Sequence, residues 1–311
     1  MNRILNFHEV NNREWFDSLI CMLKSKYNLI SLDSLYNFHT DPLKMRNSCH
    51  ITIDDGDISF YDVIFPVLKK HKVPASVYVS PKICKEKTNY WFQEIHGYNQ
   101  VELKRIITDM INIPNSSLDK YNSGTIFKTL TIYQINEIIK RYKGKNITLQ
   151  KQFQNMTVEN LNEVAKSGLV TIGAHTLNHP ILKNEDDETS KFEITESKNE
   201  LSNLLGYEVK YFVYPNGIPN IDFTEREEQF LRNIDINFAF TTEPRNLSIN
   251  DSVFRLPRFV IPDCQSALAV RSKLLLGSKW GNLRKLKSTS ELIDRKEIAQ
   301  IISTGILPEF E

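Results

Sequence analysis

The chain has 311 residues, of which 41% are hydrophobic and 25% charged, and this is the composition of an ordinary globular protein. Its formal net charge of +1 gives no electrostatic reason to expect nucleic acid as a partner. No apolar run approaches the roughly 20 residues that a transmembrane helix needs, and the four cysteines lack the spacing of a disulfide framework or a thiolate metal site.

The N-terminal stretch MNRILNFHEV lacks the long apolar segment and the small-residue cleavage site of a secretory signal. The scattered, unpaired cysteines also suit a reducing compartment. We therefore expect a cytoplasmic protein that acts in the cytoplasm or at the inner membrane face.

Strand-like and helix-like segments alternate at the start of the chain. Alternating or β-branched stretches indicate strands over 3–10, 50–55 and 74–81, and a short strand with a turn over 28–38. Apolar residues at helical spacing indicate helices over 13–27 and 59–73, the second started or kinked by Pro66. This alternation predicts a parallel sheet covered by helices.

Residues 85–155 interrupt the alternation and read as a mostly helical insertion. Its aromatic residues Trp91, Phe92 and Tyr98 are more typical of a core, with a platform for a sugar ring as the alternative. The alternation then resumes, with helices over 157–168, 190–206 and 226–235, strands over 169–175, 209–215 and 236–242, and an extended segment over 253–262. Residues 263–311 form a helical, basic tail, so we expect one barrel domain over 1–311 that carries the insertion.

Acidic residues crowd the end of the strand over 50–55. Asp54, Asp55 and Asp57 surround Gly56, and neighbouring ionised carboxylates repel each other. A bound cation is the first candidate to offset that cost, although Asp-Asp-Gly is also found in simple turns.

His175 and His179 follow another strand. Pro180 disfavours a helix at this point, because the residue before a proline is pushed toward extended conformations. Both histidines are therefore expected on a loop at the carboxyl end of the strand, where parallel architectures place their active sites. Two imidazoles and a carboxylate suit a catalytic zinc site and also other divalent metals, with a chance occurrence of the spacing as the alternative.

These segments resemble the motifs of a known family. TIDDGD and HTLNH resemble the first two motifs of the polysaccharide deacetylases with NodB homology, carbohydrate esterase family four, with Ile53 in place of the usual phenylalanine. FVYPNG over 212–217 resembles the third motif, and FRLPRF over 254–259 the arginine-bearing segment of one branch. The resemblance covers roughly 1–85 and 157–262. It implies a distorted (β/α) barrel that removes the acetyl group from an N-acetylglucosamine-type sugar, oligosaccharide or sugar conjugate in glycan or surface-polysaccharide biosynthesis.

The resemblance also implies roles for single residues. Asp55, His175 and His179 would hold a divalent metal, with zinc first and cobalt, nickel or ferrous iron as alternatives. Asp54 would be the general base toward the metal-bound water that attacks the acetyl carbonyl.

Further residues are implied to support this chemistry. Asn216 would offer its backbone N–H to the oxyanion, in a turn that also brings Tyr214 to the substrate. Arg258 would hold Asp54 ionised, with Arg255 as the second choice. An ordinary turn and surface ion pairs are the alternatives.

One departure from the family concerns the general acid. The family usually has a C-terminal Leu-x-His motif, whereas this chain has no histidine after His179. Some branches carry a histidine on the first strand instead, which a barrel permits because its first and last strands are neighbours. We therefore predict His8 as the general acid, with a backbone-bonded histidine at a strand end as the alternative.

Two other functions remain open at this point. The same site could remove an O-acetyl ester or cleave a non-sugar amide, and an inactive barrel could only bind glycan. An adjacent base beside a full set of metal donors favours an enzyme over a binding module.

Overall fold

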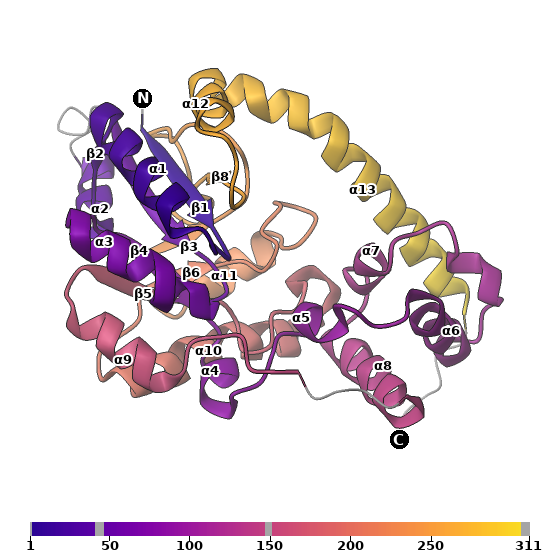
Figure 1. The fold of residues 1–311 in the computed structure, drawn as a ribbon. Coiled ribbons are helices and arrows are strands. Elements are labelled where there is room, and N and C mark those ends of the chain that lie inside the picture. The colour runs from indigo at the N-terminus through magenta and orange to yellow at the C-terminus, as the bar shows by residue number, and fades with distance from the viewer. Residues whose placement is uncertain (1, 41–46, 147–150, 306–311) are drawn as a thin grey trace.

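The computed structural model describes residues 2–40, 47–146 and 151–305, so the last six residues of the predicted tail lie outside the described part (Figure 1). Within it, parallel strands form one sheet in the order β7–β6–β5–β4–β3–β1–β8, and β2 pairs with the start of β3. The strands are β1 (Arg3–Phe7), β2 (Asn28–Leu29), β3 (Ser48–Ile53), β4 (Ala75–Val79), β5 (Val170–Ala174), β6 (Tyr211–Val213), β7 (Phe238–Phe240) and β8 (Phe259–Val260).

The two ends of this sheet approach each other. Phe240 at the end of β7 forms a parallel bridge with Leu256, which lies three residues before β8. Residues of β8 pair in turn with Leu5 and Asn6 of β1. The sheet therefore curls into a distorted (β/α) barrel, and the predicted fold class is confirmed.

The chain also forms helices that connect the strands, several of them on the outside of the sheet (Figure 1). They are α1 (Arg13–Lys26), α2 (Leu32–Thr40), α3 (Phe65–His71), α4 (Pro81–Glu86), α5 (Trp91–Ile95), α6 (Gln100–Ile111), α7 (Ser123–Phe127), α8 (Ile132–Lys145), α9 (Val158–Lys166), α10 (Asp187–Leu205), α11 (Glu225–Arg232), α12 (Ala267–Leu276) and α13 (Ser278–Thr304). Pro66 lies in the first turn of α3, as the sequence predicts.

The prediction of a turn after the strand at residue 28 is wrong. β2 is followed by helix α2, whose first turn is capped by Ser31 through a hydrogen bond from the Ser34 N–H to Ser31 Oγ (3.3 Å). Leu32 and Leu35 of this helix are buried. A serine cap before leucines at helical spacing is a helix signal. The prediction missed it because the segment is short.

The segment between β4 and β5 has a hydrophobic core of its own. Buried side chains of α5, α6, α7 and α8 form a cluster separate from the core under the barrel sheet. Ile298 of α13 is fully buried in the same cluster, and Ile301 and Ile302 pack against it. The C-terminal helix therefore joins the barrel side of the molecule to this helical insertion, as Figure 1 shows.

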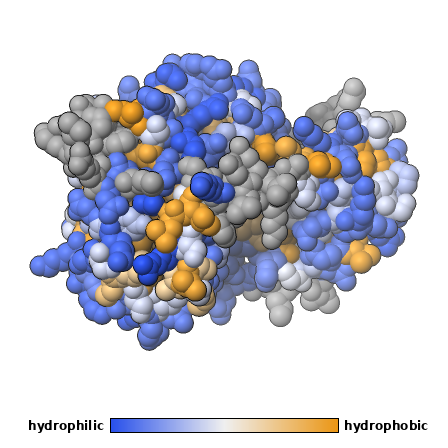
Figure 2. All heavy atoms as spheres, turned by 90° about the horizontal axis from the view of Figure 1, so that it is seen from above, coloured by the Kyte–Doolittle hydropathy of each residue, from blue (hydrophilic) through white to orange (hydrophobic). Residues whose placement is uncertain are grey.

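The surface seen from above, where α12 and α13 lie, is mainly hydrophilic, with apolar side chains gathered in a few areas (Figure 2). Leu268 and Leu275 of α12 are among the exposed large hydrophobic residues. Among the described residues, we find no helix with the length and apolar character needed to cross a membrane.

A buried histidine in β3 makes the stability of the fold depend on pH. His50 Nδ1 donates to the Ile30 carbonyl (2.7 Å), and its Nε2 lies 2.9 Å from Ser76 Oγ. Burial lowers the pKa of His50 to about 4 from an ordinary 6.5. Between these two pKa values, His50 binds a proton in the unfolded chain but not in the folded chain. The contribution of neutral His50 to the stability of the fold is therefore complete above pH 6.5 and is lost as the pH falls toward 4.

We expect His50 to account for a loss of about 2 kcal/mol in the free energy of unfolding between about pH 7.5 and about pH 5. Urea unfolding of the wild type and of His50→Gln at both pH values gives the loss in the free energy of unfolding for each protein. The difference between these two losses measures the contribution of His50. An equal loss in both proteins would contradict the assignment.

Candidate active site

The polar residues that the sequence analysis singles out follow the carboxyl ends of parallel strands. His8 directly follows β1, Asp54 and Asp55 directly follow β3, and His175 directly follows β5. Tyr214 directly follows β6. Because parallel strands end at the same edge of a sheet, residues distant in sequence meet there.

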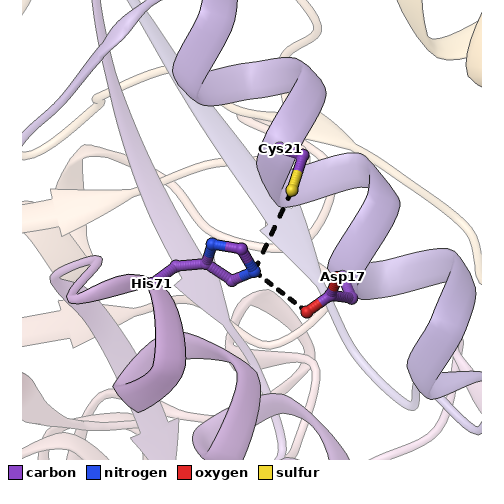
Figure 3. Close-up of side chains that lie close together, drawn as sticks. All are labelled: Asp17, Cys21 and His71. Carbon is purple, nitrogen blue, oxygen red and sulfur yellow. Dashed lines mark hydrogen bonds and ion pairs between the residues drawn. The ribbon is translucent and has the colours of Figure 1, made fainter.

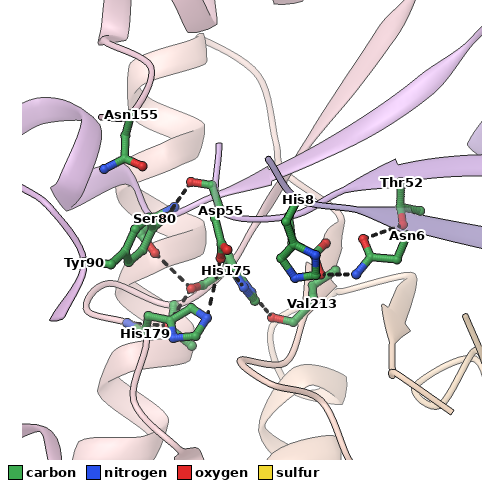
Figure 4. A network of polar contacts seen from close by, with 12 residues as sticks. Asn6, His8, Thr52, Asp55, Ser80, Tyr90, Asn155, His175, His179 and Val213 are labelled. Atoms are coloured by element: carbon green, nitrogen blue, oxygen red, sulfur yellow. Dashed lines mark hydrogen bonds and ion pairs between the residues drawn. The ribbon is translucent and has the colours of Figure 1, made fainter. Parts of the chain in front are cut away.

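Asp55, His175 and His179 form a compact cluster of possible metal donors. Each offers one ligand atom, and these atoms lie within 4.8 Å of one another. Asp55 Oδ1 is 3.3 Å from His175 Nε2 and 3.6 Å from His179 Nε2, and Figure 4 shows the three side chains converging. One carboxylate and two imidazoles are the donor set of a catalytic zinc site with room for a further ligand, and they also suit other divalent metals.

The surroundings of these donors determine their protonation and orientation. Burial alone would raise the pKa of the Asp55 carboxyl, but contact with His175 and the other nearby histidines holds it well below its usual value. Burial and the neighbouring His175 lower the pKa of His179 to about 3, so its imidazole is neutral at pH 7. His175 Nδ1 donates to the Val213 carbonyl (2.7 Å), which leaves its Nε2 directed at Asp55.

Two observations show that a divalent cation fits this cluster. First, the buried atoms Asp55 Oδ1 and His179 Nδ1 have no hydrogen-bond partner among the described residues. Second, burial acts to lower the pKa of His175, yet contact with the Asp55 carboxylate raises it overall. A positive charge is therefore favoured at His175 beside the Asp55 carboxylate, and an ion there would give Asp55 Oδ1 a partner.

Several residues of the site have a left-handed backbone. The φ angles are +69° at Asp55, +62° at Thr176, +57° at His179 and +60° at Asn216. Such conformations cost about 1–3 kcal/mol each and gather at functional sites, and β-branched Thr176 is the most unusual of the four. At Asp55 this conformation turns the chain sharply after β3, so that Asp54 and Asp55 meet different partners.

The turn after β3 is held from two sides. Gly56 has a φ of +67°, and a Cβ at this position would lie 2.6 Å from Val79 Cγ1, so the turn requires glycine. Tyr90, just before α5, donates its hydroxyl hydrogen to the Asp55 carbonyl (2.8 Å). Asp57 accepts a hydrogen bond from the Ser59 N–H (2.8 Å) and so caps the following helical segment.

The loop with the two histidines is also fixed by its neighbours. Thr176 Oγ1 donates to the His175 carbonyl (2.5 Å) and accepts from the His179 N–H (3.1 Å). The buried Glu193 carboxylate of α10 accepts the backbone N–H groups of residues 177 and 178 (both 2.9 Å). Trp91 Nε1 donates to the His179 carbonyl (2.9 Å). Glu193, Trp91 and Tyr90 are supports that the sequence reasoning did not assign.

Asp54 is held as an ionised carboxylate beside this cluster. Arg258 Nη1 and Nη2 donate to its two oxygens (2.7 and 2.8 Å), and Asn6 Nδ2 donates to Oδ2 (2.8 Å). The guanidinium of Arg258 is fully buried and also donates to Thr52 Oγ1 and the Thr241 carbonyl. Burial alone would raise the pKa of Asp54, but Arg258 outweighs it and holds this pKa below its usual value.

The other two charged candidates lie in different surroundings. Arg255, the second choice as a partner of Asp54, instead forms an ion pair with Glu228 of α11. His8 lies at the cavity, with its Nε2 3.9 Å from Asp54 Oδ2, and its side chain is 44% exposed. His8 is therefore an accessible titratable group beside the buried carboxylate.

The turn after β6 contributes a backbone donor and a buried ring. Asn216 lines the cavity, and its N–H makes no hydrogen bond within the described part of the chain. The Tyr214 hydroxyl donates to the Phe254 carbonyl (3.1 Å), and its ring stacks on Phe223 at 3.6 Å. The Tyr214 hydroxyl is thus engaged in holding the turn, while the residue also lines the cavity.

These groups surround a cavity of about 200 Å³ that both the barrel and the insertion line. Trp91, Phe92 and Lys128 form the insertion side. Tyr98, the third aromatic residue considered as a sugar platform, stacks on Tyr142 inside the insertion instead (4.1 Å). The cavity is lined by His8, Asp54, Asp55, Trp91, Phe92, Lys128, His175, His179, Ile181, Tyr214, Asn216 and Thr242.

A second group of potential metal donors joins α1 to α3 (Figure 3). His71 Nε2 lies 2.9 Å from Asp17 Oδ1 and 4.0 Å from Cys21 Sγ. Lys70 Nζ also donates to Asp17 Oδ1 (2.7 Å). This carboxylate oxygen already takes part in two hydrogen bonds, whereas Asp55 Oδ1 has no hydrogen-bond partner among the described residues. We therefore interpret the group as an interhelical ion pair.

Comparison with protein families places these residues in a wider context. A family model described as polysaccharide deacetylase matches residues 44–231, more than half of the chain. A poly-beta-1,6-N-acetyl-D-glucosamine N-deacetylase of Staphylococcus aureus is 26% identical over 173 residues. The match covers 50% of this chain and spans 57% of the length of that relative.

Solved structures agree with the fold. The deacetylase PplD of Streptococcus pyogenes, solved in complex with acetate, has a TM-score of 0.57 at 17% identity and covers 88% of this chain and 96% of its own. The structure of IcaB from Ammonifex degensii has a TM-score of 0.57 at 17% identity, with coverage of 90% and 96%. At this level of identity the likeness establishes the architecture.

Proposed function

Because the chain belongs to the polysaccharide deacetylase family, we propose that it removes the acetyl group from N-acetylglucosamine units of a glycan or surface polysaccharide. One observation carries the proposal: an ionised Asp54, a fitting set of metal donors and the accessible His8 share one cavity. The named activity of the Staphylococcus aureus relative supports the choice of sugar.

Asp55, His175 and His179 are the residues that would hold the metal, with zinc as the first choice from the donor set. When bound, such an ion acts as a Lewis acid that polarises a carbonyl and lowers the pKa of water. Val213, Thr176 and Tyr90 keep the three donor side chains or their backbones in place. These contacts limit the reorganisation that the site needs during the reaction.

Asp54 is placed to act as the general base. Its carboxylate is ionised at neutral pH, and Arg258 fixes its orientation through two hydrogen bonds. In our proposal it takes a proton from the water that attacks the acetyl carbonyl. The Asn216 N–H, which makes no hydrogen bond to the described residues, would then donate to the oxygen that gains negative charge.

His8 is placed to protonate the leaving amine. Its imidazole is at the cavity, with its Nε2 3.9 Å from Asp54 Oδ2. An amide needs this proton because a free amine anion is a very poor leaving group.

The role of His8 predicts a dependence on the leaving group. We expect His8→Gln to lower N-deacetylation by about 10²–10⁴-fold. Hydrolysis of p-nitrophenyl acetate should fall far less, because its phenolate leaves without a proton. Turnover of both substrates by the wild type and the variant measures the contrast, and an equal loss on both would show that His8 does not act as the acid.

The substrate class can be tested by acetate release from a panel of acetylated compounds. The panel contains N-acetylglucosamine free, nucleotide-linked, lipid-linked and as a β-1,6-linked oligomer, an O-acetylated sugar and a non-sugar N-acetyl amide. We expect release from an N-acetylglucosamine substrate and little from the last two. Preference for the ester or for the non-sugar amide would replace the proposal, and glycan binding without release from any compound would indicate a binding protein.

A further inference from the structure

The C-terminal helix reaches the walls of the catalytic cavity through one buried arginine. Arg295 of α13 pairs with Asp222, with Nη1 of the arginine 2.6 Å from Oδ1 of the aspartate. Both side chains are buried, at 7% and 0% exposure. These residues are 73 positions apart in sequence, and Arg295 lies outside the segment that the family model matches.

Asp222 in turn holds the turn that contains Asn216. Its second oxygen, Oδ2, accepts from Asn216 Nδ2 (2.8 Å) and from the Ile218 N–H (2.8 Å). Asn216 has the left-handed backbone described above, and its side chain bond to Asp222 is a constraint on that conformation. The direction of the Asn216 N–H therefore depends on the position of Asp222.

The same guanidinium also contacts a residue on the insertion side of the cavity. Arg295 Nη2 donates to the Lys128 carbonyl (3.1 Å), and Lys128 lines the cavity from the insertion. One turn earlier on α13, Glu291 forms an ion pair with Lys128 Nζ (2.8 Å). The planar guanidinium thus joins a barrel loop and the insertion, a double contact that a lysine side chain cannot reproduce.

We propose that Arg295 is a positioning residue that fixes the Asn216 turn and the Lys128 wall in their working geometry. This inference rests on the proposed function, because it assigns a consequence for turnover to the direction of the Asn216 N–H. Removal of Arg295 leaves the buried Asp222 carboxylate without its positively charged partner. Burial already raises the pKa of Asp222 against the opposing charge of the arginine. Asp222 Oδ2 would then no longer be held in a fixed position as the hydrogen-bond acceptor that orients the Asn216 turn.

Steady-state kinetics of Arg295 variants tests the inference. We expect Arg295→Met to lower kcat by about 100-fold, the scale of an ångström-sized misplacement of a catalytic group, with KM changed little because the affected contact forms in the transition state. Arg295→Lys keeps the charge but only one of the two contacts, so its loss should be smaller. Glu297→Gln is the matched control, since Glu297 pairs with Lys120 and Tyr121 on the outer side of the same helix and should keep wild-type kinetics.

A second measurement separates this inference from the proposed function. Amide hydrogen exchange over 214–222 should be faster in both Arg295 variants than in the wild type, while exchange in β3 and β5 is unchanged. This readout needs no turnover, so an inactive wild type would contradict the proposed function without deciding the role of Arg295. Folded Arg295 variants with unaltered exchange over 214–222, or with kcat within about twofold of an active wild type, would overturn the inference.

A double substitution checks that Arg295 acts through Asp222. If Asp222→Asn and Arg295→Met break the same connection, their effects on kcat should be far from additive when combined. Additive losses would overturn the proposed route. If Arg295→Met does not fold, Arg295→Lys takes its place in the same cycle.

Discussion

Asp54→Asn is expected to lower N-deacetylation by about 10²–10⁴-fold, the usual contribution of a general base. The substitution keeps the size of the side chain but removes the charge that would accept a proton. The metal donors Asp55, His175 and His179 are untouched, so metal content should stay at the wild-type level. Acetate release and bound metal, measured on the same sample, check both halves of this expectation.

The matched control for this variant is Asp57→Asn. Asp57 lies three residues further along and accepts a hydrogen bond from the Ser59 N–H, an interaction that asparagine can also make. Its activity should remain within a few-fold of the wild type. Thermal unfolding is recorded alongside, because Asp54→Asn leaves the buried Arg258 uncompensated, and breaking such a pair costs about 3–5 kcal/mol. A folded, metal-containing Asp54→Asn protein with wild-type turnover would rule out Asp54 as the base.

Loss of a single metal donor is expected to abolish both metal binding and turnover. The proposed site has three protein ligands, and loss of even an outer-shell partner costs about 10–100-fold in affinity, so His179→Ala should weaken binding by much more. Metal analysis after gel filtration should find about one ion per wild-type chain and almost none in this variant. Acetate release should fall to background in the same preparation.

The cluster of Asp17, Cys21 and His71 provides the control for this prediction. Cys21→Ser should leave metal content and turnover unchanged, because we interpret this cluster as an ion pair between helices. Cobalt(II) gives a further distinction, since thiolate ligands produce an intense near-ultraviolet charge-transfer band that oxygen and nitrogen donors do not. We expect no such band in the cobalt-loaded wild type. A band that Cys21→Ser removes would show that the metal is bound at the other cluster.

The barrel and the position of its site could be predicted because both depend on local sequence signals. β-branched strands alternate with amphipathic helices, and parallel pairing then brings the residues after each strand to one edge. His8, Asp54, Asp55 and His175 directly follow such strands. Their convergence is a consequence of topology and needs no knowledge of individual side-chain contacts.

The supports of the site could not be predicted in the same way. Tyr90 and Trp91 contact the carbonyls of Asp55 and His179 from the insertion, and the aromatic pattern there resembles that of any core. Arg295 contacts Asp222, which holds the Asn216 turn, from a helix that begins after the last barrel strand. These contacts depend on how the insertion and α13 pack against the barrel, which no local periodicity specifies.

The contacts of the Tyr214 side chain could not be predicted either, although a motif identifies this residue. In the structure Tyr214 directly follows β6 and lines the cavity. Its hydroxyl, however, donates to the Phe254 carbonyl, and the ring stacks on Phe223. The motif thus gave the position of the turn, whereas tertiary packing decides what the Tyr214 hydroxyl contacts.

The proposed function requires the donors Asp55, His175 and His179 and the base Asp54 to act together in a metal-dependent deacetylation. Acetate release from a β-1,6-linked N-acetylglucosamine oligomer tests it most directly, measured with chelator-stripped protein and again after one equivalent of zinc is returned. We predict no release from the stripped protein and recovery on adding zinc, with no recovery in Asp54→Asn. Equal release with and without metal, or none from zinc-loaded wild type, would contradict the account.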